Sequence, residues 1–140
     1  MNTLELYGLI RRLNRIADLD SRKLVTRSGL SIPQWLALDF LSKQSDCICT
    51  QLELRKALNL NSSTVTGIVS RLESKGAVVK LPVTGDKRNV RLALTQLGLD
   101  KISREQLSDW SELENRLGSM TLEQKTDFQQ KLIEIVHFLE

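Results

Sequence analysis

The sequence NSSTVTGIVSRLESKG, residues 61–76, is the most informative segment for the fold. Its aliphatic residues recur at steps of three and four, which predicts an amphipathic helix with a buried stripe of Val65, Ile68, Val69 and Leu72. Asn61 or Ser62 can cap the start of this helix, and Gly76 suits the left-handed position after its end. The remaining side of the helix is dense in hydroxyl groups, more than a cap requires.

A shorter helix is expected directly before this one. Thr50 can cap it, with Glu53 three residues later as its capping-box partner, and it ends at Asn59. The two helices form a helix-turn-helix pattern, in which the second helix enters the major groove of DNA.

After Gly76 the period changes from helical to alternating. Residues 77–82 and 90–94 are β-like runs, and residues 83–89 between them are rich in turn-forming and charged side chains. This pattern predicts a β-hairpin wing beside the two helices.

Helical periodicity extends to both ends of the chain. We expect further helices up to Ser28, from a Ser31 cap to about Lys43, from a Thr95 cap to Leu117, and after a Thr121 cap, with a single-bridge strand at residues 47–49. The predicted fold class is mainly α with a small β-hairpin wing: a winged helix-turn-helix in one domain, residues 1–140.

Composition and charge narrow the function. With 41% hydrophobic and 26% charged residues among 140, the chain is expected to be globular and not disordered. No apolar run approaches the roughly 18 residues that span a membrane, and no signal-peptide pattern is found, so we expect no membrane association. The net charge is +5 over residues 51–91 and −4 over residues 92–140. A basic middle segment favours nucleic-acid binding.

Two motifs together resemble the MarR family of bacterial winged-helix regulators. Residues 61–76 resemble its recognition helix, with the S-T-V-T and R-L-E-x-x-G elements. The stretch GDKRNVRLALTQLG, residues 85–98, resembles its D-x-R wing followed by L-T-x-x-G. The resemblance implies a sequence-specific DNA-binding transcriptional regulator, most often a repressor. Cys47 and Cys49 are poorly placed to bond each other and no other cysteine is available, which favours a location in the cytoplasm.

The predicted contacts with double-stranded DNA lie on the recognition helix and the wing. They are Asn61, Ser62, Ser63, Thr64, Thr66, Gly67, Ser70, Arg71, Asp86, Lys87 and Arg88. By resemblance, Arg88 reaches the minor groove and Asp86 braces its loop. The alternatives are that the polar residues only cap a helix and that Asp86 and Arg88 form a surface ion pair of little energetic worth.

The resemblance also implies a homodimer on a pseudo-palindromic site. Residues 1–28 and 98–140 would form the dimerisation helices, and residues 30–95 the DNA-binding lobe. Family members that bind small aromatic acids do so between these two parts. In this chain, a small aromatic or anionic effector would contact Arg15 and Trp35. The alternative for Trp35 is that it packs in the core.

No other chemistry is indicated. The sequence has no nucleophile elbow, phosphate-cradling glycine loop or paired acid and base, so we expect no enzyme and no cofactor. His137 is the single histidine, and no metal site is predicted. Cys47 and Cys49 are interpreted as structural thiols, with a redox switch as the alternative. A winged-helix protein-interaction module without DNA binding is the alternative function, which a salt-dependent mobility shift would distinguish.

Overall fold

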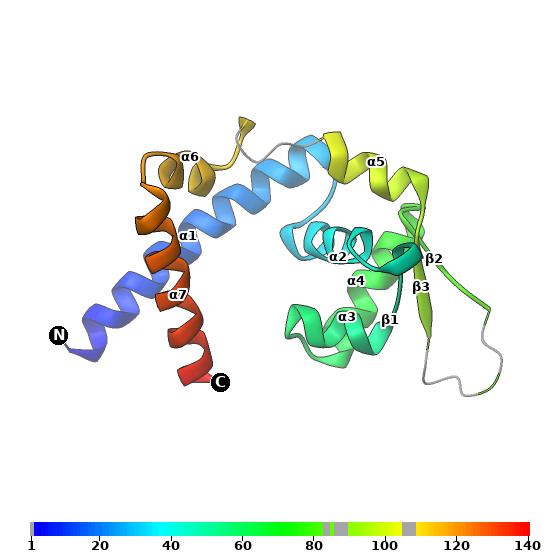
Figure 1. Cartoon of the computed structure of the whole chain (residues 1–140), viewed down its shortest axis with the longest axis horizontal. Helices are drawn as coiled ribbons and strands as arrows, with labels where there is room; N and C mark the ends of the chain where they lie inside the picture. The colour runs from blue at the N-terminus through cyan, green and yellow to red at the C-terminus, as the bar shows by residue number, and fades with distance from the viewer. Residues whose placement is uncertain (1, 83–84, 86–89, 105–108) are drawn as a thin grey trace. The chain divides into compact units, whose positions relative to one another are not determined.

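The computed structural model describes residues 2–82, 85, 90–104 and 109–140. Its elements follow the order α1 (Thr3–Ser28), α2 (Ile32–Ser42), β1 (Ile48–Thr50), α3 (Gln51–Leu58), α4 (Ser62–Ser74), β2 (Val78–Lys80), β3 (Arg91–Leu94), α5 (Gln96–Arg104), α6 (Glu112–Gly118) and α7 (Leu122–Leu139). A mainly helical chain with one small antiparallel sheet confirms the predicted fold class (Figure 1). Within the described ranges, no helix is long and apolar enough to cross a membrane.

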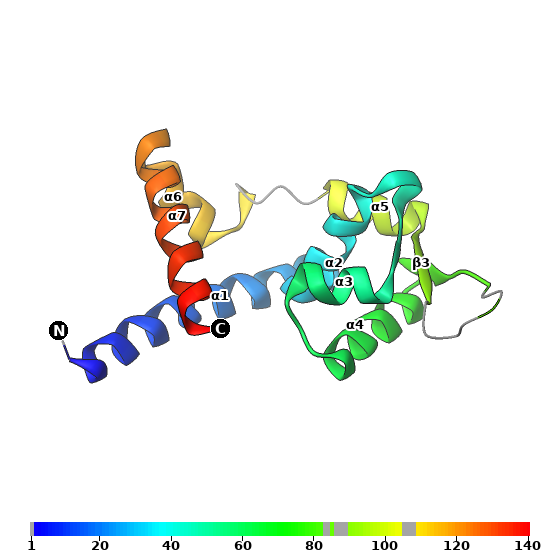
Figure 2. The same cartoon turned by 60° about the horizontal axis from the view of Figure 1, so that its bottom comes forward.

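The chain forms two compact units, residues 1–23 with 107–140 and residues 24–106. In the unit of residues 24–106, α5 lies on one side of α2, and α3 and α4 lie on the other (Figures 1 and 2). The core between them includes Leu30, Ala37, Leu38, Leu41, Leu54, Val65, Val69 and Leu72. The predicted stripe of α4 is therefore buried in the centre of this unit.

The three strands form an antiparallel sheet with β3 in the middle. Cys49 of β1 pairs with Leu92, and Val79 of β2 pairs with Ala93. The expectation that the first strand includes Cys47 is wrong. Cys47 belongs to a 3₁₀ turn, Ser45–Cys47, and its φ of 55° removes it from the extended backbone that a strand requires.

The L-T-x-x-G element builds the corner between the sheet and α5. The Thr95 hydroxyl donates to the Gly76 carbonyl at 2.6 Å and accepts from the Gly98 backbone N–H at 3.1 Å. Gly98 is buried against the Ala77 carbonyl, and a Cβ at position 98 would lie 2.3 Å from that oxygen. Only glycine lets the first turn of α5 approach Ala77, the residue before β2, so closely.

In the other unit, a buried carboxylate joins α1 to α6. Asp20 is 5% exposed. It accepts from the Ser111 hydroxyl at 2.8 Å and from the backbone N–H groups of Glu112 at 2.7 Å and Leu113 at 3.2 Å. Ser111 in turn accepts from the Glu114 N–H as the N-cap of α6. The carboxylate thus satisfies donors that the start of a helix leaves free.

The prediction of one helix from Thr95 to Leu117 is wrong. The helix that follows Thr95, α5, ends at Arg104, and α6 begins only at Glu112. The apolar spacing continues through this region, but Ser111 and Asp20 form a helix start that the spacing does not reveal. Trp110, expected on the helix stripe, is buried immediately before that cap.

We predict that Gly98→Ala lowers the free energy of unfolding by about 1–3 kcal/mol, because the new methyl group overpacks against the Ala77 carbonyl. Gly8→Ala is the matched control, since no atom lies within 4 Å of a Cβ built in α1 at that position. Denaturant titration at one fixed chain concentration measures both variants. A Gly98→Ala protein as stable as the wild type would contradict this account of the corner.

We predict that Asp20→Asn destabilises the chain by about 1–3 kcal/mol near pH 7. Burial raises the pKa of Asp20, but the hydrogen bonds from Glu112, Ser111 and Leu113 and the charge of Lys23 outweigh it and hold the pKa below its usual value. A carboxyl whose pKa is lowered by folding stabilises at neutral pH and loses this contribution as the pH falls through its folded-state pKa.

The difference in unfolding free energy between wild type and Asp20→Asn should therefore shrink in acid. Asp18→Asn, on an exposed position of α1, is the control and should change stability little. A difference that is constant from about pH 7 to about pH 3 would show that ionisation of Asp20 plays no part.

Candidate nucleic-acid interface

The turn between α3 and α4 sets the start of the predicted recognition helix. Asn59 ends α3 in the left-handed conformation, with φ 50° and ψ 50°. Asn61 is the N-cap of α4, which decides between the two predicted caps: its Oδ1 accepts from the Thr64 N–H at 2.8 Å. The Ser63 hydroxyl donates to the same oxygen at 2.8 Å.

The outward side of α4 carries small side chains. Residues 63, 67, 70 and 74 follow one another at helical spacing, opposite the buried stripe. Six predicted contact residues of this helix are exposed and Gly67 is partly buried; the exposed ones are Ser62, Ser63, Thr64, Thr66, Ser70 and Arg71. The cap residue, Asn61, is exposed as well. Short side chains leave the helix backbone free to approach the floor of a groove.

Gly67 lies next to Arg71, a long side chain on this face of α4. A Cβ at position 67 would lie 3.6 Å from Nη1 of Arg71, which is ordinary contact. Nothing in the described chain therefore requires glycine at this helical position. Lys75, at the end of α4, is directed towards the start of α2: its ammonium group contacts the Gly29 carbonyl and lies 3.3 Å from Oε1 of Gln34.

Gln51 belongs to the same surface, and sequence reasoning missed it. It is the first residue of α3, and its backbone N–H donates to the Val90 carbonyl at 2.8 Å. Its side-chain Nε2 donates to the Thr66 hydroxyl at 3.0 Å, and Thr66 donates to the Ser62 carbonyl at 2.8 Å. The only sequence signal was its place directly after the Thr50 cap.

The wing is described only in part. Gly85 has a φ of +103°, a conformation that favours glycine. Asp86, Lys87 and Arg88 lie outside the described residues, so their predicted contacts stay predictions. At the base of the hairpin, Arg91 is exposed and Lys80 lies 3.9 Å from Glu73 of α4.

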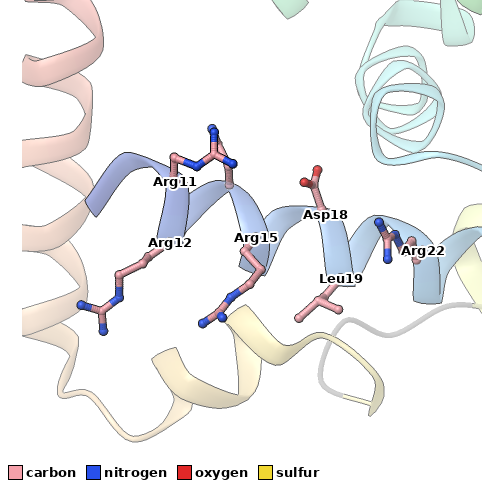
Figure 3. A pocket seen from close by; sticks show the side chains of 7 residues that line it. Arg11, Arg12, Arg15, Asp18, Leu19 and Arg22 are labelled. Carbon is pink, nitrogen blue, oxygen red and sulfur yellow. The ribbon is translucent and has the colours of Figure 1, made fainter. Parts of the chain in front are cut away.

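The predicted effector residues belong to different units. Arg15 lines a depression of about 540 Å³ along α1, together with Arg11, Arg12, Asn14, Asp18, Leu19 and Arg22. Figure 3 shows that these guanidinium groups point away from the helix in several directions and do not converge. Trp35 packs against the core of the other unit, and its Nε1 is buried without a hydrogen-bond partner among the described residues. A pocket containing both residues stays a prediction.

The two cysteines differ in their surroundings. Cys49 is buried in the sheet, and burial, together with the charge of Glu53, raises the pKa of its thiol to about 11. Cys47 is partly buried, and its Sγ lies 3.9 Å from the Ser42 carbonyl. A thiol with a raised pKa is a poor nucleophile, which favours a structural role for Cys49.

A sequence model of the MarR family matches residues 28–89, from α2 through the recognition helix into the wing. The regulator PecS of Dickeya dadantii is 29% identical over 98 residues, which are 69% of this chain and 59% of PecS. The chain thus spans less than two thirds of that relative.

Solved structures extend the likeness over the whole chain. A MarR family transcriptional regulator of Streptomyces coelicolor, Sco3205, solved with DNA, has a TM-score of 0.83 at 20% identity, covering 100% of this chain and 94% of Sco3205. A MarR family protein from Bacillus stearothermophilus is 27% identical, with a TM-score of 0.66 and coverage of 99% and 98%. In its recognition helix, wing motif and L-T-x-x-G corner, the chain is similar to proteins of the MarR family.

Proposed function

We propose that the chain is a sequence-specific DNA-binding regulator of transcription, most simply a repressor. The outward face of α4 supports this function best, because it joins a capped helix N-terminus to a row of short polar side chains above a buried stripe. The family match covers this helix, and Sco3205 was solved with DNA. Such a regulator would act in the cytoplasm, where bacterial DNA lies.

In this proposal, the first turns of α4 enter the major groove and the wing follows the backbone into the minor groove. Asn61, Ser62, Ser63, Thr64 and Gly67 would approach base edges or phosphates from the N-terminal turns. Ser70 and Arg71 would meet the adjacent strand. Asp86, Lys87 and Arg88 would act from the wing, with Arg88 in the minor groove.

We further propose that the protein acts as a homodimer through the chain-end helices. Among the described residues, α7 has no buried side chain, and its apolar residues Phe138 and Leu139 are 89% and 67% exposed. On α1, Leu4, Tyr7 and Leu9 are exposed as well. Apolar surface of this extent is typical of a face that a second copy covers. Two copies would present two recognition helices to a pseudo-palindromic site.

We also propose that a small effector releases the protein from DNA. Arg15 offers a guanidinium for a carboxylate, and Trp35 offers an aromatic ring and an N–H that has no partner among the described residues. Both groups suit a small aromatic acid. Thermal stabilisation of the chain by aromatic carboxylates, lost in Arg15→Ala and in Trp35→Ala, would support such a site.

The first test is retention of DNA. Genomic fragments captured by the purified chain should share a palindromic sequence. Gly67→Ala should weaken binding to a duplex of that sequence by about 1–3 kcal/mol, because the added methyl group would lie where the helix approaches the DNA most closely. The same variant should gain up to about 1 kcal/mol in unfolding free energy, since alanine is the better helix former. Fluorescence anisotropy and denaturant titration measure the two effects.

Gly8→Ala is the control for the gain in helix propensity, since it makes the same change in α1, outside the proposed DNA contacts of α4 and the wing. Opposite signs for stability and affinity in Gly67→Ala alone would support groove contact. Unchanged affinity for the selected duplex would move the contact away from this face of α4. If no fragment is retained at any salt concentration, the protein-interaction module becomes the better function.

The second test is the mass of the particle. Light scattering at micromolar concentration should give twice the mass of one chain. Ile135→Asp should shift the protein towards monomer, because Ile135 shares the α7 stripe with Phe128 and Leu132 and a charge there opposes apolar burial. Gln129→Asp on the same helix should leave the dimer intact. A monomer mass for the wild type would contradict the dimer.

A further inference from the structure

The hydroxyl of Thr66 has its proton already committed. Thr66 Oγ1 donates to the Ser62 carbonyl at 2.8 Å and accepts from Gln51 Nε2 at 3.0 Å. A threonine hydroxyl has one proton and two acceptor lone pairs. One lone pair is therefore left for a ligand, although the residue itself is exposed.

Gln51 fixes this arrangement from the neighbouring helix. Because the Thr66 proton points to Ser62, the group that faces Oγ1 must be a donor, which assigns the Gln51 amide with its NH₂ towards Thr66. The backbone of Gln51 is held in place by the Val90 carbonyl, at 2.8 Å. The side-chain bond of Gln51 therefore resists rotation of the Thr66 hydroxyl, and its backbone bond keeps Gln51 in place.

A hydroxyl that can only accept is selective. It cannot bond to a phosphate oxygen, because both groups are acceptors. In the major groove it can meet the amino group of adenine N6 or cytosine N4, but not the acceptors guanine O6 or thymine O4. A threonine hydroxyl that rotates freely could bond to either kind of base edge, as a donor or as an acceptor.

We propose that Thr66 reads the side of one base pair that carries an amino group, and that Gln51 is the positioning residue that sets this polarity. The inference rests on the proposed DNA-binding function and adds the chemistry of its specificity. On a given strand, one position in each half-site should favour adenine or cytosine over guanine or thymine.

The test is selection from a random duplex library by the full-length wild type, Thr66→Val, Thr66→Ser and Gln51→Met. The wild type and Thr66→Ser should share an adenine-or-cytosine bias at one position of each half-site, and Thr66→Val should lose it. Gln51→Met should reduce the bias, because the hydroxyl can then rotate. Circular dichroism confirms that each variant is folded.

Two controls isolate the hydrogen bond. Thr126→Val removes the same kind of bond, from Thr126 to the Leu122 carbonyl at 2.9 Å, in α7, and should leave the selected sequence unchanged. In the selected duplex, the favoured base can be replaced by the nucleotide that lacks its exocyclic amino group. That change should weaken wild-type binding by about 3- to 10-fold and Thr66→Val binding hardly at all.

The possible outcomes distinguish failure of the reading role of Thr66 from failure of the proposed DNA binding. A sequence preference that Thr66→Val leaves intact, or a guanine-or-thymine bias where Thr66→Val has its effect, would overturn the reading role of Thr66 and leave DNA binding standing. A full bias in Gln51→Met would overturn the positioning role of Gln51. If the wild type retains no duplex, both the inference and the proposed function fail.

Discussion

Burial of Val65, Ile68, Val69 and Leu72 on one side of α4 is the constraint on which the rest of this surface depends. The four side chains fix the rotation of the helix about its axis, so the same residues face outward in every molecule. The cost of exposing such a stripe, about 1.5–3 kcal/mol for each side chain, makes another rotation inaccessible. The small outward residues are useful for recognition only because the opposite side is held in this way.

The recognition helix is also tied to its surroundings by polar contacts. Gln51 joins three parts: its backbone bonds to Val90 before β3, its side chain bonds to Thr66 of α4, and it opens α3. The Thr95 and Gly98 corner holds β2 and α5 together on the far side of the same core. In the other unit, Asp20 has an equivalent role at the start of α6. Thr95 and Asp20 each satisfy backbone donors at the start of a helix, whereas the first N–H of α3, that of Gln51, bonds to the backbone carbonyl of Val90.

Local signals made much of this fold predictable. Capping pairs such as Thr50 with Glu53 and Thr121 with Gln124 lie three residues apart and located two helix starts correctly. The signals failed where the partner is distant in sequence: Ser111 begins α6 with Asp20, so the apolar spacing alone joined α5 and α6 into one helix. Gln51 was missed for the same reason, since its link to Thr66 exists only after α3 and α4 have packed.

The central claim is that the outward face of α4 meets DNA. Titration of the ¹⁵N-labelled chain with a selected duplex, followed by NMR, tests this claim most directly. The account predicts that the largest shift changes occur at the amides of residues 61–71, and that those along the arginine-lined depression of α1, residues 11–22, change little. The reverse pattern, with α1 perturbed and the amides of α4 unchanged, would contradict it.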